Sequence, residues 1–260
     1  MIYVSTHAGK RHTITEDSVL VGTEVVSDVS GSFPMPDAGF ICIADGVGGN
    51  CGGAQASGFV LRALAKWKDN PDVELKSFLI KTNDDLISCA LDEGIASDMA
   101  TTLTGILVAN DGYRIVHIGN TRAYIKQGKY LKQITSDHTT FNWLMSSGQI
   151  EAAEHCNKSE ITNCFGGKNP ALLSKLYIAD CQQFSLALLT SDGVHDYVDL
   201  DTLEEILAVV LIQGPTFDIC TRSNPALRRK VLLSHSHFGQ MVVWNGKDST
   251  SSTQQSLSIA

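Results

Sequence analysis

The sequence predicts an α+β fold in which antiparallel sheets are covered by helices. Short apolar runs typical of strands occur in hairpin pairs, and amphipathic segments typical of helices lie in blocks between them. This pattern differs from the alternating strand–helix–strand units that indicate a parallel sheet. Two of the apolar runs, residues 40–44 and 184–189, lead into Asp-Gly steps at Asp45-Gly46 and Asp192-Gly193. Apolar runs of this length bounded by glycine are typical of buried strands.

The predicted strands follow short runs of β-branched and apolar residues. They span residues 2–7, about 18–26, 39–44, 104–108, 114–118, 123–126, 130–134, 186–190 and 241–244. Asn110-Asp111-Gly112 is a strong signal for the turn of one hairpin, and Gln127-Gly128 indicates a second. The stretch at 31–36, rich in Gly, Ser and Pro, is interpreted as a connection that leads into the strand at 39–44.

The predicted helices follow apolar positions that recur at the helical period. They span residues 54–67, 73–91, 141–147, 202–211 and 225–233. The fourth opens with a capping box that begins at Thr202, and the fifth follows the cap and first-turn proline of Asn224-Pro225. The helix at 141–147 lies inside a polar, irregular stretch, residues 138–175, which we interpret as an insertion over the body of the fold.

Length and composition indicate a single domain. The chain has 260 residues, 43% of them apolar, without a clear linker or internal repeat, so we expect one domain over residues 1–246. Residues 247–260 are rich in Ser, Thr and Gln and are expected to be disordered. The net charge is −8 and no run of Lys or Arg forms a basic stripe, which argues against a nucleic-acid partner. No apolar stretch reaches the length of a transmembrane helix, so we expect no membrane partner.

The cysteines and the N-terminus favour a cytoplasmic protein. The seven cysteines are odd in number, scattered and without a Cys-x-x-Cys pair. This pattern is typical of reduced thiols and argues against disulfides or a zinc site. The N-terminus has no basic region followed by a long apolar segment, so no signal peptide is evident. We expect a cytoplasmic monomer.

The two Asp-Gly steps suggest a site for divalent cations. A carboxylate at the end of a buried strand lies where a hard cation can reach it, and the following glycine lets its backbone carbonyl approach that cation. Oxygen donors suit Mg²⁺ or Mn²⁺ rather than Zn²⁺. A single Asp-Gly step is more often a turn. Two copies, together with Glu16-Asp17 and the glycine-rich loop at 48–53, favour a site.

Six motifs in order make the chain similar to the metal-dependent PP2C-type (PPM) serine/threonine protein phosphatases, in their prokaryotic style. The resemblance covers about residues 2–244 and rests on several short runs. These are Gly9-Lys10-Arg11 with Glu16-Asp17-Ser18, Ala44-Asp45-Gly46-Val47-Gly48-Gly49, Ala100-Thr101-Thr102-Leu103-Thr104, Ile118-Gly119-Asn120-Thr121-Arg122-Ala123-Tyr124, Ile134-Thr135-Ser136-Asp137-His138 and Thr190-Ser191-Asp192-Gly193-Val194. The resemblance implies an αββα sandwich, two antiparallel sheets flanked by helix pairs, with a metal centre at one end.

The resemblance also implies a role for each acidic residue. Asp45 would bridge two Mn²⁺ or Mg²⁺ ions, and the Gly46 carbonyl would bind one of them. Asp192 would bind the second ion, while Glu16 would hold its partner directly or through water, with Asp17 close by. A water activated by the paired ions would attack the phosphorus directly, without a covalent enzyme intermediate.

The chain departs from the family pattern at three places. The segment between Gly9 and Glu16 is one residue longer than usual, so either Arg11 or His12 could hold the substrate phosphate. Asn120 replaces an aspartate, which weakens any third, more labile metal site. In the last motif Ser236 or His237 occupies the place of a metal-binding aspartate. That loss of charge weakens one site unless His237 acts as a nitrogen ligand, which Mn²⁺ accepts more readily than Mg²⁺.

Three functional hypotheses follow. The favoured one is metal-dependent hydrolysis of phosphoserine and phosphothreonine in proteins, with a phosphorylated protein as substrate and, by analogy, a cognate Ser/Thr kinase as partner. The alternative is a pseudophosphatase that binds a phosphoprotein through an impaired metal centre. A small-molecule phosphatase with the same metal chemistry is the third. Asp137-His138 could supply a general acid and its partner, or could equally cap the insertion.

Overall fold

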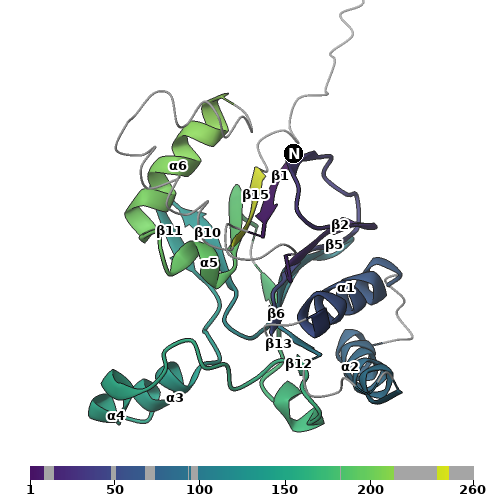
Figure 1. Ribbon diagram of the computed structural model, residues 1–260. Coiled ribbons are helices and arrows are strands. Elements are labelled where there is room, and N and C mark those ends of the chain that lie inside the picture. The colour runs from purple at the N-terminus through teal and green to yellow at the C-terminus, as the bar shows by residue number, and fades with distance from the viewer. Residues whose placement is uncertain are drawn as a thin grey trace, which may run out of the picture.

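Two six-stranded antiparallel sheets form the centre of the computed structural model (Figure 1). The first sheet has the order β11 (Tyr130–Gln133), β10 (Arg122–Gln127), β14 (Leu186–Thr190), β15 (Gly239–Asn245), β1 (Ile2–His7) and β4 (Ser30–Phe33). The second has the order β13 (Tyr177–Cys181), β9 (Gly112–Ile118), β8 (Leu103–Ala109), β5 (Gly39–Ala44), β2 (Ser18–Gly22) and β3 (Glu24–Val26). The structure describes residues 1–8, 15–47, 51–67, 74–92, 94, 99–181, 183–213 and 239–245.

The two sheets pack face to face through alternating apolar side chains. In β5, Ile41 and Ile43 belong to the apolar layer between the sheets, while Phe40, Cys42 and Ala44 belong to the layer beneath the helices. Successive side chains of a strand point to opposite faces, so a strand buried on both sides reads as a continuous apolar run. This explains why the run before Asp45 is so uniformly apolar.

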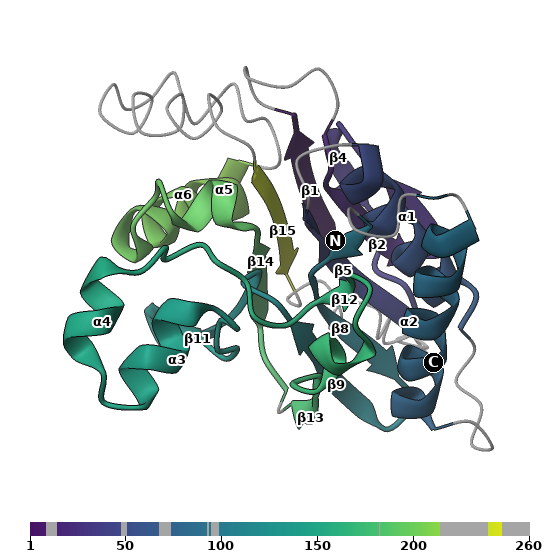
Figure 2. The same ribbon diagram turned by 60° about the horizontal axis from the view of Figure 1, so that its bottom comes forward.

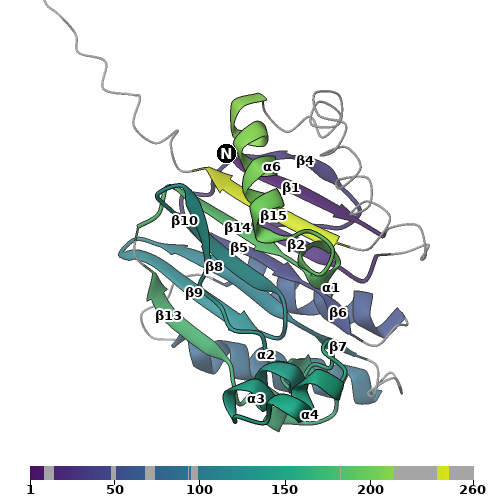
Figure 3. The same ribbon diagram turned by 90° about the vertical axis from the view of Figure 1, so that its left-hand side faces the viewer.

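Helices cover the outer face of each sheet (Figures 2 and 3). Helices α1 (Cys51–Ala65) and α2 (Leu75–Asp92) pack on the second sheet through an apolar cluster that includes Leu61 and Leu79. Helices α5 (Asp192–His195) and α6 (Leu200–Gln213) cover the first sheet, where Leu203 and Leu207 of α6 contact the strands. The predicted αββα sandwich is confirmed.

A small third sheet and a helical insertion complete the described fold. The sheet has the order β12 (Phe165–Gly166), β7 (Ala100–Thr101) and β6 (Gly46–Val47). The insertion contains α3 (Thr140–Ser146), α4 (Ile150–His155) and the 3₁₀ helix η1 (Pro170–Leu173), and Figure 1 shows α3 and α4 projecting from the body. Among the described helices, none combines the length and the apolar character that a bilayer crossing requires.

Several elements differ from the sequence-based expectation. β13 was not predicted, and α6 begins at Leu200, where Asp199 rather than Thr202 supplies the capping side chain by accepting from the Thr202 N–H at 2.8 Å. Residues 18–26 form a hairpin rather than one strand, because Gly22 adopts a φ of +63° and reverses the chain. The stretch interpreted as a connection contains β4, which pairs with β1 at one end of the described sheet. The insertion holds α4 in addition to the predicted helix at 141–147.

Several predictions fall outside the described residues. These are the helix at 225–233, the disordered tail at 247–260, the phosphate-binding residues Arg11 and His12, and the last-motif residues Ser236 and His237. Residues 48–50, the first half of the glycine-rich loop at 48–53, also lie there. These expectations stay predictions.

Candidate metal centre

Three aspartates converge where the two sheets end on the same side. Asp17 directly precedes β2, and Asp45 directly follows β5. Since Ser18 pairs with Ala44 in antiparallel register, Asp17 and Asp45 lie opposite one another across the two strands. Asp192 comes from the other sheet, as the first residue of α5 after β14. Residues far apart in the sequence are thus brought to one point.

Asp45 contacts the carboxyl groups of both Asp17 and Asp192, and the charge of Asp192 also acts on Asp17. The Asp45 side chain lies within hydrogen-bonding reach of both Asp17 and Asp192. The pKa of Asp17 is raised to about 7, chiefly by burial; the hydrogen bond with Asp45 opposes this rise, while the charges of Asp192 and Glu16 add to it. The pKa of Asp45 is raised well above its ordinary value, first by burial and then by the charges of Asp17 and Asp192. The described residues supply this cluster with acid groups and no matching cation.

Thr101 and Thr102 fix the backbone of Asp45. The Asp45 carbonyl accepts hydrogen bonds from the Thr102 backbone N–H and the Thr101 hydroxyl, both at 2.9 Å. The Asp45 N–H donates to Thr102 Oγ1 at 3.0 Å. Gly119, at a φ of +105°, packs so closely on Thr102 that a Cβ there would lie 2.6 Å from Thr102 Cβ. The second, third and fourth motifs therefore support one another around Asp45.

Close glycine contacts bring Glu16 to the same place. A Cβ at Gly46 would overlap the Gly53 backbone and would lie 2.7 Å from the Glu16 carbonyl oxygen. A Cβ at Gly53 would lie 3.0 Å from Glu16 Oε2. The Ser57 hydroxyl of α1 donates to the Glu16 carbonyl at 2.6 Å. The start of α1 therefore holds the Glu16 segment beside Asp45, and only glycines fit in the gap.

Asn120 completes the described part of the cluster. Its Nδ2 donates to Asp192 Oδ2 at 3.1 Å, and the residue is 4% exposed. Asn120 Oδ1 and Asp17 Oδ2 are buried and have no hydrogen-bond partner among the described residues. A buried oxygen that accepts no hydrogen bond lowers the stability of the folded protein. Such oxygens are the donors that Mg²⁺ and Mn²⁺ prefer, so the residues present fit these ions.

Within the described part of the chain, no three His, Cys, Asp or Glu side chains already stand at the spacing of a complete ligand set. The structure brings Asp17, Asp45, Asp192, Asn120 and Glu16 to one place. Their assignment as metal ligands, with the Gly46 carbonyl, stays a prediction.

Next to this cluster lies an ion pair whose role was not predicted. Arg122 follows Asn120 in the fourth motif, and its guanidinium donates to Asp137 through Nε and Nη2 at distances of 2.6 to 3.0 Å. Asp137 is 8% exposed and also accepts from Gln133 Nε2 at 3.2 Å. Thr139, two residues further on, caps α3 by accepting from the Asn142 N–H. Asp137 therefore anchors the base of the insertion.

A pair of histidines fixes the loop that carries Asn120. His117 Nε2 donates to the Ser136 carbonyl at 2.9 Å, so its Nδ1 is the acceptor for the Thr104 hydroxyl at 2.8 Å. Burial lowers the pKa of His117 to about 4. The Gly119 N–H donates to His138 Nδ1 at 3.1 Å, and the His138 N–H donates to the Gly119 carbonyl at 2.8 Å. His138 belongs to the fifth motif and His117 directly precedes the fourth, but nothing in the sequence indicated these contacts.

Comparisons with known proteins agree with this geometry. A family model described as "Protein phosphatase 2C" matches residues 28–220. The Listeria monocytogenes protein named serine/threonine phosphatase stp is 29% identical over 179 residues, which cover 64% of this chain and 71% of that protein. The Mycobacterium tuberculosis protein named serine/threonine protein phosphatase PstP is 33% identical over 180 residues, 66% of this chain. The matched part spans 35% of PstP.

Solved structures show the same fold. The crystal structure of Mycobacterium tuberculosis PstP aligns with a TM-score of 0.68 and 24% identity, covering 94% of this chain and 97% of that one. PppA of Pseudomonas aeruginosa aligns with a TM-score of 0.69 and 22% identity over the same shares. A further structure of the PstP catalytic domain, in complex with two manganese ions, aligns with a TM-score of 0.65 and 24% identity, over 94% and 98% of the chains.

Proposed function

The chain belongs to the protein phosphatase 2C family, and we propose that it hydrolyses phosphoserine and phosphothreonine in proteins with Mn²⁺ or Mg²⁺ held by Asp17, Asp45 and Asp192. From the sequence we retain a cytoplasmic monomer as the acting form, with a cognate Ser/Thr kinase supplying the phosphorylated protein. Two ions are expected, as in the manganese complex described for PstP.

The observation that carries the proposal is the contact of Asp45 with both Asp17 and Asp192. Asp45 hydrogen-bonds the other two side chains, which come from different sheets. Asp17 is 4% exposed and Asp45 is partly buried, so their negative charges would repel strongly in a medium of low dielectric constant. Divalent cations remove that repulsion, and the partnerless Asp17 Oδ2 and Asn120 Oδ1 offer further oxygen donors to them.

The residues of the chain hold and orient this centre. Bound divalent cations supply an activated water for attack on phosphorus and neutralise charge on the phosphoryl oxygens. Thr101 and Thr102 keep the Asp45 backbone fixed. The Asn120 amide orients the Asp192 carboxylate through its hydrogen bond at 3.1 Å. Arg11 or His12 is the expected phosphate-binding side chain.

Phosphate release from a phosphothreonine peptide tests the proposal. EDTA-stripped protein should be inactive, addition of Mn²⁺ should restore release, and Mg²⁺ should restore it to some degree. The matched control is Asp84→Asn, which removes an exposed carboxylate from α2 and should leave the rate unchanged. Release no faster than a protein-free blank at saturating Mn²⁺ would refute catalysis of this reaction.

A pseudophosphatase is the second candidate, because Ser236 or His237 takes the place of a metal-binding aspartate and Asn120 carries no charge. In this case the protein would bind a phosphopeptide without releasing phosphate. Calorimetric titration with Mn²⁺ distinguishes the phosphatase from the pseudophosphatase, because an impaired metal centre would bind at most one ion weakly. The variants Ser236→Asp and His237→Asp should then raise both Mn²⁺ affinity and activity.

A further inference from the structure

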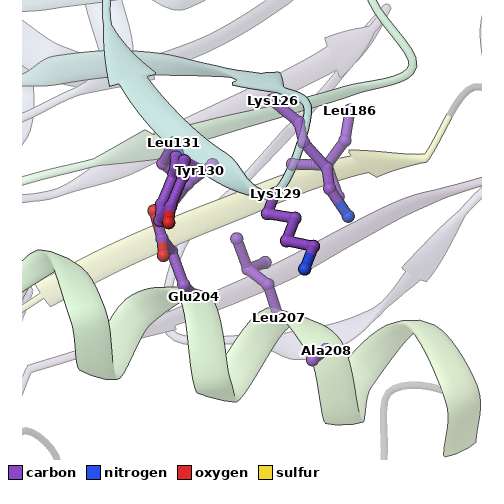
Figure 4. Close-up of a pocket in the computed structure, with 8 residues that line it drawn as sticks. All are labelled: Lys126, Lys129, Tyr130, Leu131, Leu186, Glu204, Leu207 and Ala208. Atoms are coloured by element: carbon purple, nitrogen blue, oxygen red, sulfur yellow. The ribbon is translucent and has the colours of Figure 1, made fainter.

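A small pocket opens between the β10–β11 hairpin and helix α6 (Figure 4). Its volume is about 90 Å³. Residues from both elements and from the start of β14 line it, namely Lys126, Lys129, Tyr130, Leu131, Leu186, Glu204, Leu207 and Ala208. Figure 4 shows Glu204 and Leu207 rising from α6 towards the hairpin, from which Lys129 reaches down.

The pocket has an apolar floor of the size of one side chain. Leu131, Leu186 and Leu207 are 6%, 2% and 4% exposed, so they form a firm base that continues into the core. The volume lies below the roughly 150 Å³ of a cavity that accepts benzene and far below the roughly 300 Å³ of small drug sites. Tyr130, which is 69% exposed, stands at the edge. The pocket therefore suits a single aliphatic side chain rather than a whole small molecule.

The rim of the pocket is basic. Residues 123–134 of the hairpin contain Lys126, Lys129 and Lys132 and no acidic residue, on a chain whose net charge is −8. Neither Lys126 nor Lys129 pairs with a carboxylate within the described part of the chain. The one acid in the pocket, Glu204, is engaged, because its Oε1 accepts the Leu131 N–H at 2.6 Å. A local basic patch on an acidic protein favours an acidic partner.

The same hydrogen bond argues against docking by strand addition. β11 is the edge strand of the first sheet, and an open edge could accept a strand from a partner. At Leu131, however, the outward N–H is already bound to Glu204 of α6. A partner therefore gains little from backbone pairing there and more from inserting a side chain.

We propose that this pocket docks an acidic segment of a partner protein, which inserts one aliphatic side chain between Leu131 and Leu207 while its carboxylates meet Lys126 and Lys129. The pocket lies at the opposite end of β14 from the metal centre: Leu186 begins the strand and Thr190 ends it two residues before Asp192. At ~3.4 Å per residue the strand separates the two by more than 10 Å. Docking there is independent of the proposed catalysis.

Fluorescence polarisation with a labelled peptide of glutamates around a central leucine tests the proposal. The wild-type protein should bind this peptide, and replacement of the leucine by serine should weaken binding. The double variant Lys126→Glu/Lys129→Glu should weaken it by on the order of tenfold or more, with a strong dependence on salt. The variant Ala208→Trp should also weaken binding, since Ala208 is exposed and a larger side chain would fill the mouth.

The matched control reverses two exposed lysines elsewhere, Lys66→Glu/Lys76→Glu, which changes the net charge equally and should leave binding intact. Thermal melting verifies that every variant is folded. Equal binding of the leucine and serine peptides would overturn the proposal, as would equal loss in the control pair. Binding to phosphatidylserine vesicles without binding to the peptide would also contradict it.

Discussion

Two neighbouring acidic sites, Asp137 and the cluster of Asp17, Asp45 and Asp192, differ in what balances their negative charge. Asp137 has its own cation: the Arg122 guanidinium donates to both of its oxygens. Among the described residues, the side-chain partners of Asp45 are the acids Asp17 and Asp192. A buried carboxylate that is hydrogen-bonded to a well-placed guanidinium has its charge balanced within the protein and needs no bound ion. The acid cluster needs protons or metal ions to balance its charge, and this contrast supports its proposed role as the functional centre.

The strongest test of the contrast is removal of the central acid. Asp45→Asn should abolish Mn²⁺-dependent phosphate release, by on the order of 10³-fold, because a bound ion supplies several kcal/mol of transition-state stabilisation. In metal-free protein the same change should keep or raise the free energy of unfolding, because a neutral amide replaces a buried carboxyl beside two others. Kinetics and urea unfolding measure the two effects. Retained activity in Asp45→Asn would contradict the proposed assignment of Asp45 as a metal ligand.

Removal of Arg122, which pairs with Asp137, should have the opposite effect on the free energy of unfolding. Arg122→Met leaves Asp137 buried and without its guanidinium, and should lower the free energy of unfolding by about 3 kcal/mol. The double variant Arg122→Met/Asp137→Asn should regain most of that loss. The control is Lys81→Met, which breaks an exposed pair with Asp85 and should cost less than about 0.5 kcal/mol. Equal losses in Arg122→Met and Lys81→Met would show that burial of the pair is unimportant.

His117, a buried base, extends the comparison to a side chain that becomes positively charged when it ionises. His117 keeps its neutral form down to a pKa of about 4, whereas an unfolded histidine protonates near 6.5. Stability is therefore lost as pH falls between these values, on the order of 2 kcal/mol from pH 7 to pH 5. Urea unfolding at both pH values should show a smaller loss for His117→Gln than for wild type. The exposed control His155→Gln should keep the wild-type loss; identical losses in all three proteins would contradict the role of burial.

The smallest expected effect concerns Asn120. Asn120→Asp adds a charge beside Asp192 in place of the hydrogen bond at 3.1 Å. Metal-free protein should lose about 1 kcal/mol of stability, while Mn²⁺ should bind more tightly. Thermal melting across a Mn²⁺ titration measures both. Asn110→Asp, in an exposed turn, serves as the control. An unchanged Mn²⁺ response would show that Asn120 lies outside the influence of the ions.

Most strands of the two central sheets and the residues of the acid cluster could be predicted from the sequence. The strand at 39–44 is buried on both faces, so its composition alone is decisive. The edge strand β4, with the sequence Ser-Gly-Ser-Phe, has weak strand propensity and depends on its pairing with β1. Pairing of this kind is a tertiary effect, which explains why the stretch resembled a connection.

The candidate site was predictable in part. Asp45 and Asp192 were found because each lies between a strand end and a glycine, and Glu16 and Asp17 because they form an acidic pair in the first motif. The motif order implied that these acids converge. The Arg122–Asp137 pair was not assigned, because an ion pair across fifteen residues leaves no local pattern. Both residues nevertheless lay within recognised motifs. The contact between His138 and the Gly119 backbone depends in the same way on three-dimensional packing.

Calorimetric titration of EDTA-stripped protein with Mn²⁺ tests the central claim most directly, using wild type and Asp45→Asn side by side. If Asp17, Asp45 and Asp192 hold the cations, wild type should bind two ions and Asp45→Asn should lose both the heat and the stoichiometry. Equal binding curves for the two proteins, or no Mn²⁺ binding by wild type, would contradict the account.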